Sequence, residues 1–308
     1  MTPKHIPVLT KEVVTALNLK AGGTYIDCTL GEGGHTHQIL KSTDLPIHIL
    51  GFEIDSSAIK SATETLQNYR NQVTIVKASY TDLVKESAEL GVIKVEGVVF
   101  DLGLSSLQLG GSGRGFSFRS DSPLDMRFDQ SQGLDAWQVV NLSTEQELAR
   151  VLRDLGEEPY ARRISKSIIK SRPINTTKQL ARLIVQSAGR RIGKIHPATR
   201  SFQAIRMKVN NELTNIRKGL DQATSMLSSE GRLVVISYHS IEDRVVKTYM
   251  SEASKNCICD PRIIECVCEH KAYLKSVNKK IVKPKDNEVE VNPRSRSARL
   301  RVAQKLAV

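Results

Sequence analysis

The sequence predicts an α/β protein, a mostly parallel β-sheet covered by helices and interrupted by an all-helical insertion. Three observations lead to this class. Short apolar runs alternate with segments of helical periodicity from residue 24 to residue 101, every periodic segment between residues 134 and 207 is helical, and an apolar strand pattern returns at residues 231–238. Alternating strands and helices are typical of a parallel sheet with helices on both faces.

Length and composition agree with a soluble protein of two domains. The chain has 308 residues, and 40% of them are apolar, which is enough to form a hydrophobic core. No run approaches the roughly 18 apolar residues that a membrane-spanning helix requires. The N-terminus lacks the apolar stretch and cleavage site of a secretion signal, and five cysteines are an odd number for a disulfide framework. We therefore expect a cytoplasmic protein that does not contact a membrane; the sequence does not determine its oligomeric state.

The first third of the chain follows a regular strand–helix order. Strands are predicted at residues 24–30, 47–53, 73–77 and 95–101, and helices at residues 10–18, 35–40, 56–69 and 81–90. Thr10 is the expected N-cap of the first helix, because a threonine hydroxyl can accept from the free N–H groups of a first turn.

A long loop precedes the helical insertion. Residues 110–129 are rich in Gly, Ser and Arg, and a loop of this length inside a compact protein is usually functional. We expect a lid that orders when substrate arrives. Its arginines have side chains suited to phosphates or carboxylates, and Asp125 is the expected partner of one of them. These arginines are Arg114, Arg119 and Arg127.

The sheet pattern returns after residue 208. A helix is predicted at residues 210–227, a strand at 231–238, a helix at 241–251, and two further strands in the tail at 276–285 and 297–306. We therefore place the sheet domain at residues 1–112 and 209–308, and the lid with the helical insertion at residues 113–208.

The insertion is strongly basic. The whole chain has a net charge of +12, and residues 159–208 contain 13 Lys and Arg but no Asp or Glu. A solvated surface normally mixes both signs, whereas an unmixed positive field attracts phosphates. We therefore predict that this region binds RNA phosphates. The side chains expected to do so are Arg162, Arg163, Lys166, Lys170, Arg190, Arg191, Lys194, Arg206 and Lys208.

Four arginines also lie in the tail, two just before the second predicted strand and two within it. They would either extend the RNA surface or, on an edge strand, block pairing with another sheet. They are Arg294, Arg296, Arg299 and Arg301.

The ends of the first two strands carry a nucleoside-binding pattern. Ligands of an open parallel sheet bind beyond the carboxyl ends of its strands. The first strand is followed by Gly31-Glu32-Gly33-Gly34-His35, where glycines let the backbone approach a ligand. The second ends in Glu53, at the spacing where an acid holds ribose hydroxyls. Thr36 stands in place of the third glycine of a dinucleotide motif, which favours a cofactor without a pyrophosphate, such as S-adenosylmethionine. An ordinary glycine-rich turn is the alternative.

The later strands also end in residues that can carry chemistry. Tyr80, after the third strand, is placed to stack on adenine or merely to pack. Asp101 ends the fourth strand, beside the expected place of a transferable methyl group, although Asp is also a common turn or cap residue. After the fifth strand, Tyr238 is expected to stack on a splayed-out base. His239 is expected either to bind the base or a phosphate, or to serve the structure alone.

Four of the five cysteines form a Cys-x-Cys-x6-Cys-x-Cys cluster near the C-terminus. They are Cys257, Cys259, Cys266 and Cys268. Four thiols can bind zinc, but structural zinc sites usually separate paired cysteines by two to four residues. We predict no metal here, with a zinc site as the alternative to a loop of free thiols.

Six segments, in order from residue 5 to about residue 301, look like the signatures of one family. They are HIPVLTKEVV, IDCTLGEGGH, FDLGLSSLQL, RGFSFRSDSPLDMRFD, ISYHSIEDRVVK and NPRSRSARLR. The chain resembles the bacterial small-subunit ribosomal RNA cytosine-N4 methyltransferases over nearly its whole length. The resemblance implies a class I S-adenosylmethionine-dependent methyltransferase fold, interrupted by helices that recognise the substrate.

The resemblance also implies a reaction and a set of site residues. The reaction is methylation of the exocyclic N4 of a cytidine in the decoding region of 16S rRNA, and we expect the assembled small subunit as substrate. The cofactor would be held by Gly33, Gly34, His35, Glu53, Tyr80, Asp101 and Gln108. The family usually has Asp in place of Glu53 and Phe in place of Tyr238. Asp101 is our candidate to accept the proton that leaves N4.

The sequence leaves two other functions open. A methyltransferase acting on DNA or protein would share the cofactor residues, although the long motifs favour rRNA. A non-catalytic RNA-binding assembly factor would have a decayed cofactor site. The intact GEGGH segment, Glu53 and Asp101 argue against decay, and cofactor binding would separate the two.

Overall fold

The structure is a computed structural model that divides the chain into two compact units. It describes residues 6–103, 113–131, 133–188, 196–260, 262, 265–278 and 280–307. The sheet unit comprises residues 1–103 and 213–308, and the helical unit comprises residues 104–212. The junctions thus fall after residues 103 and 212, where the sequence led us to expect them after residues 112 and 208.

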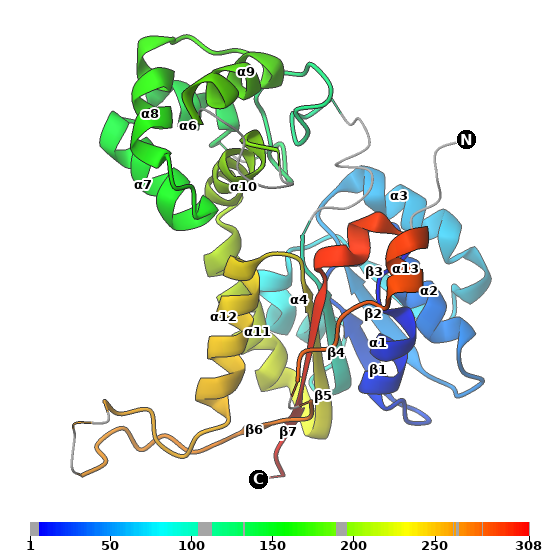
Figure 1. The fold of residues 1–308 in the computed structure, drawn as a ribbon. Helices are drawn as coiled ribbons and strands as arrows, with labels where there is room; N and C mark the ends of the chain where they lie inside the picture. Colours follow the sequence, from blue (N-terminus) through cyan, green and yellow to red (C-terminus); the bar gives the residue numbers. More distant parts are fainter. Residues whose placement is uncertain are drawn as a thin grey trace. The chain divides into compact units, whose positions relative to one another are not determined.

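The sheet unit is built on seven strands in the order β3-β2-β1-β4-β5-β7-β6 (Figure 1). The strands are β1 (Thr24–Asp27), β2 (His48–Phe52), β3 (Val73–Val76), β4 (Val95–Asp101), β5 (Leu227–Ser237), β6 (Leu274–Ser276) and β7 (Arg299–Lys305). Strands β1 to β5 run parallel, whereas β7 is antiparallel to both of its neighbours. The prediction of a mostly parallel sheet is confirmed.

Helices cover both faces of this sheet (Figure 1). One face packs against α1 (Thr10–Leu17), α2 (Gly34–Lys41) and α3 (Ser56–Thr65), and the other against α4 (Leu83–Glu89), α11 (Glu212–Met226) and α12 (Ser240–Ala253). Successive strand residues point to opposite faces. Val98 and Phe100 accordingly lie in one hydrophobic core, while Val99 lies in the other. Burial on both faces explains why these strands read as continuous apolar runs.

Thr10 is not the N-cap of α1, contrary to the prediction. Leu9 precedes the helix with a left-handed backbone (φ 52°), and its N–H donates to Oε1 of Glu288 at 2.8 Å. The Thr10 hydroxyl instead donates to the carbonyl oxygen of Pro7 at 2.9 Å. A side chain 279 residues away therefore satisfies a donor at this helix start, and local sequence could not reveal it.

The tail differs from its prediction in two respects. The expected strand at 276–285 is wrong: β6 ends at Ser276, and within that range only Val282 forms an isolated bridge among the described residues. Pro284, which has no N–H to donate to a ladder, is followed by the short helix α13 (Asp286–Val291). Strand β7 is confirmed, but it is not an edge strand because β6 pairs along its other side.

The helical unit has its own hydrophobic core. Its helices are α6 (Ala136–Leu142), α7 (Glu145–Gly156), α8 (Ala161–Lys170), α9 (Thr177–Ala188) and α10 (Ala198–Val209). Asp135 and Thr144 begin α6 and α7 with capping boxes, in which side chain and backbone bond reciprocally. Leu148, Ile164 and Ile205 are fully buried between the helices. The all-helical character of this region is as the sequence predicted.

The described part of the expected lid, residues 113–129, is packed into this helical core. Phe116, Leu124 and Met126 are buried there. The N–H of Trp137 in α6 donates to the carbonyl oxygen of Leu124 at 2.7 Å, and the N–H of Thr177 in α9 donates to that of Ser122 at 2.9 Å. The aromatic and aliphatic residues of the segment thus make it part of the helical unit rather than a free lid. The first residues of the predicted loop, 110–112, lie outside the described residues.

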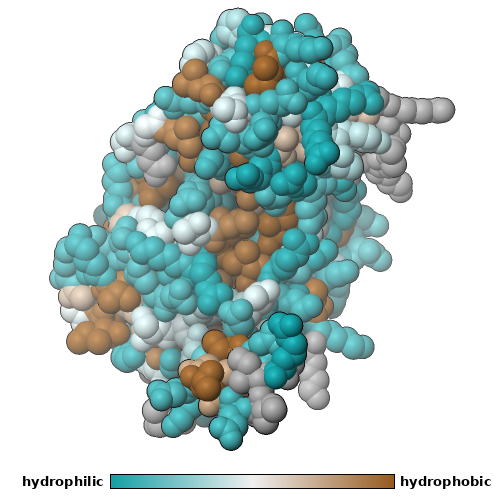
Figure 2. Space-filling view, turned by 90° about the vertical axis from the view of Figure 1, so that its left-hand side faces the viewer, coloured by the Kyte–Doolittle hydropathy of each residue, from teal (hydrophilic) through white to brown (hydrophobic). Residues whose placement is uncertain are grey.

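None of the described helices is long and apolar enough to cross a membrane. The face of the protein shown in Figure 2 is mostly hydrophilic, with hydrophobic residues gathered in a few patches, the broadest near the middle of the view.

Candidate active site

The carboxyl ends of three neighbouring strands bring ionisable side chains together in the sheet unit. Strand β4 lies between β1 and β5, all three parallel, so their carboxyl ends meet at one edge of the sheet. Asp27 ends β1, Asp101 ends β4, and Tyr238 directly follows β5. His35 joins them from the first turn of α2. This is the edge at which parallel sheets bind ligands.

Three of these side chains lie in a row, with Asp101 between His35 and Tyr238. Nε2 of His35 lies 2.8 Å from the carbonyl oxygen of Val8. Because a carbonyl only accepts, Nε2 carries a proton, and the other ring nitrogen, Nδ1, lies 3.4 Å from Oδ2 of Asp101. On the far side, the hydroxyl of Tyr238 donates to Oδ1 of Asp101 at 2.7 Å. The Val8 carbonyl thereby orients the His35 ring. Through this contact, Val8 of the HIPVLTKEVV motif supports the site.

Tyr238 acts as a permanent donor to Asp101. Burial, reinforced by the neighbouring Asp101 carboxylate, raises the pKa of the Tyr238 phenol well above its ordinary value. The phenol therefore keeps its proton at neutral pH. Its ring lies against Gly103, where a Cβ atom would come within 3.2 Å of the ring, and φ at Gly103 is +113°. Both features favour glycine at this turn.

Asp27 is a site residue that the sequence analysis missed. Only 2% of its surface is exposed, and its carboxylate accepts from the Thr36 hydroxyl at 2.8 Å and from the Thr29 N–H at 3.2 Å. Burial raises its pKa, while His35 and these hydrogen bonds oppose the rise. The Thr29 hydroxyl in turn accepts from the backbone N–H of Asp101 at 2.7 Å. Thr36, which stands where a dinucleotide site would have glycine, therefore holds the Asp27 carboxylate in place through its hydroxyl. The available signal was an acid at the end of a buried strand.

The glycine-rich loop and Glu53 are joined across β1 and β2. The Glu53 carboxylate accepts from the N–H of Gly31 at 2.9 Å through Oε2, and from the N–H groups of Ile54 and Asp55 at 2.8 and 2.9 Å through Oε1. Burial raises the pKa of Glu53, and the three N–H donors oppose this. Gly33 has φ +81°, a conformation that L side chains rarely adopt, and directly precedes α2, which begins at Gly34.

These residues fit a nucleoside. An ionised carboxylate offers about four acceptor positions, and the three backbone N–H groups leave Glu53 capacity to accept from a ribose hydroxyl. Tyr80 is half-buried, with its ring edge-on to Phe100 at 5.6 Å and close against Gly219 of α11, where a Cβ would lie 2.6 Å away. Its ring is therefore fixed in place. The remaining predicted cofactor residue, Gln108, lies outside the described residues.

His239 serves the start of α12. Its Nδ1 accepts from the N–H of Glu242 at 3.2 Å as the helix N-cap, and its Nε2 lies 2.9 Å from Oε1 of the same, fully buried residue. The ring is thus held by the first turn of the helix that follows β5.

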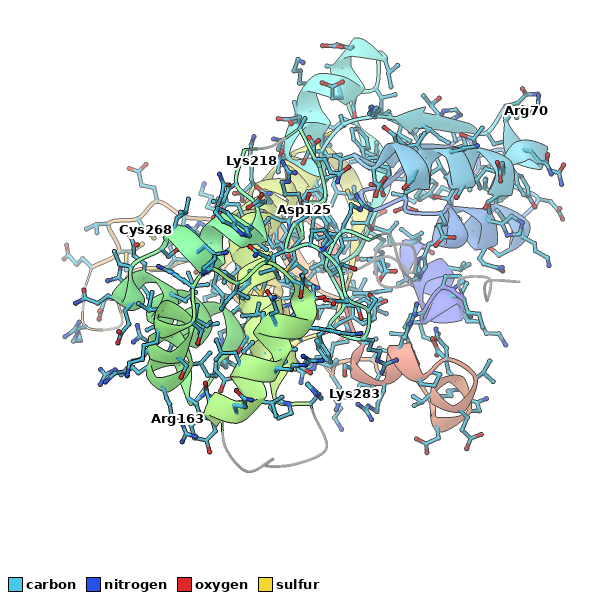
Figure 3. The ribbon with its side chains drawn as sticks, turned by 90° about the horizontal axis from the view of Figure 1, so that it is seen from above. Arg70, Asp125, Arg163, Lys218, Cys268 and Lys283 are labelled. Carbon is cyan, nitrogen blue, oxygen red and sulfur yellow. The ribbon has the colours of Figure 1, made fainter. Side chains whose placement is uncertain are left out.

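The predicted RNA-binding side chains of α8 are exposed together. Arg162, Arg163 and Lys166 are exposed, whereas Ile164 and Ile168 of the same helix are buried. Figure 3 shows Arg163 on the outside of the helical unit. This separation of charge and apolar residues follows from the helical repeat.

The three arginines of the expected lid have different surroundings. Arg119 is exposed. Arg127 forms a bidentate ion pair with Asp125, at 2.9 and 2.8 Å, and Arg114 donates weakly to the carbonyl oxygen of Phe128 at 3.4 Å. Arg190 and Arg191, together with Lys194, lie outside the described residues.

Several basic residues have structural partners instead. Arg206, expected at the RNA surface, is buried and forms two hydrogen bonds with Glu212, at 2.7 and 2.9 Å. In the tail, Arg299 and Arg301 bind the buried carboxylate of Asp243 at 3.0 and 2.7 Å. These arginines tie β7 to the first turn of α12, so the expected edge-strand role is wrong for them.

The helical unit also contains a cavity that the sequence analysis did not predict. It has a volume of about 310 Å³ and is lined by Phe118, Lys178, Ala181, Arg182, Val185, Gln186 and His196. The rings of Phe118 and His196 stack with their centroids 4.5 Å apart, beside two exposed cations. Aromatic rings next to cations suit single-stranded RNA. Phe118 and His196 are too far apart in the sequence for a local pattern to reveal the pair.

The fold and the site together define the class of this protein. A sheet ordered β3-β2-β1-β4-β5-β7-β6 with β7 reversed, and a glycine-rich loop paired with an acid at the end of β2, are those of a class I methyltransferase, which uses S-adenosylmethionine. A model of the MraW methylase family matches residues 2–306, and the chain belongs to that family. The family resemblance inferred from the motifs is thereby confirmed.

Curated relatives match along almost the whole chain. A protein of Dehalococcoides mccartyi named ribosomal RNA small subunit methyltransferase H is 44% identical, over 98% of this chain and 86% of its own length. A protein of the same name from Clostridioides difficile is 42% identical, over 98% of this chain and 99% of its own. A solved structure of an rRNA methylase from Streptococcus thermophilus is 9% identical with a TM-score of 0.44, covering 97% of this chain and 94% of that one.

Proposed function

We propose that this protein transfers a methyl group from S-adenosylmethionine to the exocyclic N4 of a cytidine in the decoding region of 16S rRNA, and that it does so in the cytoplasm on the assembled small subunit. The observation that carries the proposal is the 44% identity, over 98% of the chain, to a protein named ribosomal RNA small subunit methyltransferase H. The choice of N4 rests on the motif resemblance to cytosine-N4 methyltransferases.

The cofactor would be held at the carboxyl ends of β1 to β4. Glu53 would accept from the ribose hydroxyls, Tyr80 would pack on the adenine, and Gly33, Gly34 and His35 would line the cofactor. Asp101 completes the set, with Gln108 proposed from the sequence alone. When bound, S-adenosylmethionine supplies an electrophilic sulfonium methyl with a neutral leaving group, so the protein's main task is to position the two reactants.

Asp101 is proposed to accept the proton that N4 loses. The lone pair of N4 is delocalised into the cytosine ring, so an acceptor on its N–H groups helps to localise it. Oδ1 of Asp101 is occupied by the Tyr238 hydroxyl at 2.7 Å, which fixes the orientation of the carboxylate. Oδ2 lies 3.4 Å from Nδ1 of His35, longer than a good hydrogen bond, and keeps accepting capacity.

Tyr238 and His239 would support this group. Tyr238 orients Asp101 through its hydroxyl and offers its half-buried ring to the substrate base. His239 fixes the turn after β5 by accepting the N–H of Glu242 at Nδ1 and by the close approach of its Nε2 to the Glu242 carboxylate. We assign His239 a positioning role because both of its ring nitrogens face the start of α12.

The helical unit is proposed to bind the RNA. Arg162, Arg163 and Lys166 on α8 would contact phosphates without reading sequence. The cavity beside Phe118 would accept an unstacked base, with Lys178 and Arg182 near its phosphates. Further RNA contacts are proposed for the arginines of the expected lid and of the segment after α9, namely Arg114, Arg119, Arg127, Arg190 and Arg191. A broad basic surface suits a large preorganised substrate such as a ribosomal subunit.

The decisive experiment is radiolabelled methyl transfer to small subunits from a strain that lacks this protein. Label on N4 of a cytidine in the decoding region, faster on subunits than on naked 16S rRNA, is the expected result. Equal rates on both would refute the subunit as the preferred substrate. Cofactor binding without label on either RNA would redirect the search to DNA or protein, and absence of cofactor binding would favour an assembly factor.

A further inference from the structure

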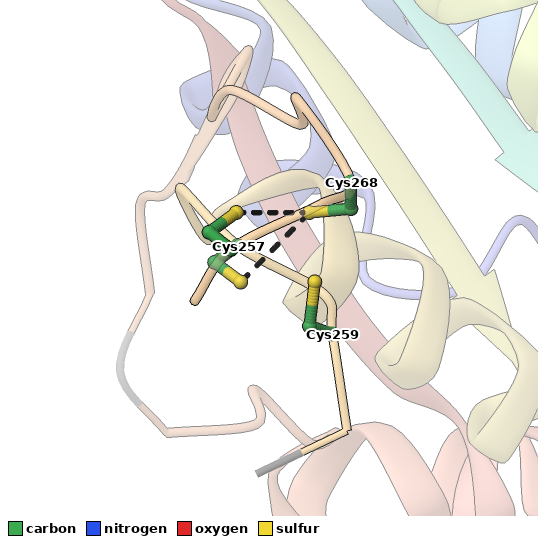
Figure 4. Close-up of side chains that lie close together, drawn as sticks. Cys257, Cys259 and Cys268 are labelled. Carbon is green, nitrogen blue, oxygen red and sulfur yellow. Dashed lines mark hydrogen bonds between the residues drawn. The ribbon is translucent and has the colours of Figure 1, made fainter. Parts of the chain in front are cut away.

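We propose that Cys257, Cys259, Cys266 and Cys268 bind one zinc ion, which holds together the loop between α12 and β6. The four sulfur atoms all lie within 4.8 Å of one another. Sγ of Cys268 is 3.6 Å from Sγ of Cys266 and 3.8 Å from Sγ of Cys257. Figure 4 shows the thiols of Cys257, Cys259 and Cys268 pointing toward one another. This site is separate from the methyl-transfer residues, and nothing in the proposed function requires it.

The sulfur spacing is that of ligands around a single ion. A tetrahedral zinc site with bonds of about 2.3 Å separates its sulfurs by about 3.8 Å. A disulfide would bring two sulfurs to about 2.05 Å, which none of these distances approaches. An iron–sulfur cluster distributes its cysteines over several irons, whereas all four sulfurs here fit within one coordination shell.

The short spacing within each pair is compatible with zinc. In extended chain, residues two apart point to the same side, so both cysteines of a Cys-x-Cys pair can face one ion. The residues between them, Ile258 and Val267, are 49% and 73% exposed. The N–H of Ile258 donates to Sγ of Cys268 at 3.5 Å and so links the two pairs. Such N–H donors commonly orient the ligands of a metal site.

The described residues of the loop have neither regular secondary structure nor a hydrophobic core to hold them. Between Ala253 and Leu274 these residues form no helix or strand, and none of those in the range 254–272 belongs to a hydrophobic core. Two contacts close the base of the loop. The N–H of Tyr273 donates to the carbonyl oxygen of Ala253 at 3.0 Å, and Nε2 of His270 lies 3.0 Å from the carbonyl oxygen of Glu252. A long loop without a core is a place where a metal ion substitutes for hydrophobic packing.

The ligand set determines the choice of metal. Four thiolates in a tetrahedral arrangement favour zinc or a single iron, and select against magnesium, calcium and manganese. Zinc is the ion commonly found in structural four-cysteine sites. A structural role agrees with a position in a surface loop of the sheet unit.

Elemental analysis of the full-length protein, purified without chelators, tests the proposal. We expect one zinc per chain, and its loss in the Cys266→Ser and Cys268→Ser variants. Val267→Ser changes the residue between these two cysteines, and Cys28→Ala removes a thiol elsewhere in the chain; both should keep the zinc. Iron or copper at one per chain, or no metal in the wild-type protein, would overturn the assignment.

Two measurements on the wild-type protein cover the case in which the serine variants do not fold. Replacement of zinc by Co²⁺ should give the thiolate charge-transfer and intense tetrahedral ligand-field absorption of a four-sulfur site; octahedral spectra would refute it. Chelation should speed trypsin cleavage at the exposed Lys255, Arg262 and Lys271 by about tenfold or more, because local opening then costs less. Unchanged cleavage would refute a role in holding the loop.

Discussion

The hydroxyl of Tyr238 donates a 2.7 Å hydrogen bond to Oδ1 of Asp101, which joins the carboxyl ends of β5 and β4. Phe is usual at the position of Tyr238 in the family that the motifs resemble, so this chain adds a bond that a phenylalanine cannot make. With His35 on the other side of the carboxylate, Asp101 is held between two neighbours. The predictions below separate what this carboxylate does from what its neighbours contribute.

Asp101→Asn should abolish most methyl transfer. If Asp101 accepts the N4 proton, turnover at saturating cofactor and RNA should fall by about 10²–10⁴-fold, because an amide is a far weaker base of the same shape. Steady-state kinetics with calorimetric measurement of cofactor affinity provide the check. Normal turnover with weakened cofactor binding would show that Asp101 contacts the cofactor only.

Tyr238→Phe should have a small effect. It removes one hydrogen bond to Asp101 but keeps the ring that packs on Gly103, so a decrease in kcat of less than about tenfold is expected. Tyr238→Ala should decrease kcat further, because it also removes the ring. If both variants had equal activity, the ring would have no role in the site.

Glu53→Ala should weaken cofactor binding by about 10–100-fold, the effect of losing one charge-assisted hydrogen bond. Glu53→Asp keeps the carboxylate and should retain most of the affinity. Glu64→Ala, an exposed acid on the adjacent helix α3, is the control. Thermal unfolding must accompany the titration, because three backbone N–H groups also lose their acceptor. Unchanged affinity in the folded Ala variant would exclude Glu53 from the cofactor site.

Asp243 should make stability depend on pH. Burial alone would raise the pKa of Asp243, but Arg301 and Arg299 outweigh it and hold that pKa below its ordinary value. The ionised form is therefore favoured by folding, so its contribution is present at neutral pH and is lost as pH falls below about 4. Asp243→Asn should lower the free energy of unfolding at pH 7 by about 1–3 kcal/mol.

Denaturant titrations of both proteins across this pH range provide the measurement. The difference between wild type and Asp243→Asn should shrink as the pH falls, because wild-type Asp243 then becomes protonated. Asp44→Asn, an exposed acid, serves as the control and should leave stability unchanged. A difference that did not depend on pH would assign the effect to packing instead of charge.

Replacing Arg162, Arg163 and Lys166 by Ala should weaken RNA binding and reduce its salt dependence. Each lost phosphate contact should lower the slope of log K against log salt concentration by about 0.7–0.9. Cofactor affinity should not change, because these side chains belong to the helical unit. The matched control replaces three exposed lysines of the sheet unit, Lys20, Lys41 and Lys60. If both triple variants lost the same affinity, binding would reflect net charge instead of a specific surface.

Much of the fold was predictable because its information is local. Strand β4 buries Val98 and Phe100 on one face of the sheet and Val99 on the other. In the sequence, this burial on both faces is visible as a continuous apolar run. The strand ends followed from the same pattern, and with them the positions of Glu53 and Asp101. The motif resemblance added the reaction and the cofactor, neither of which periodicity could supply.

The contacts that organise the site could not be predicted, because each joins residues distant in the chain. Asp27 meets Thr36 and stands near His35 only once α2 packs beside β1. The expectation of a free lid was wrong for residues 113–129. Sequence alone could not show that Phe116 packs into the core of the helical unit.

The sequence by itself thus determined the elements, the class of enzyme and the candidate residues, since periodicity and motifs are properties of neighbouring residues. Only the tertiary structure decided which side chains meet. It paired Arg299 and Arg301 with Asp243 and joined Glu288 to Leu9. It also brought the four cysteine sulfurs of the tail within 4.8 Å of one another. The physical reason is that a hydrogen bond or a metal site depends on atomic distances, which are fixed only when the whole chain has packed.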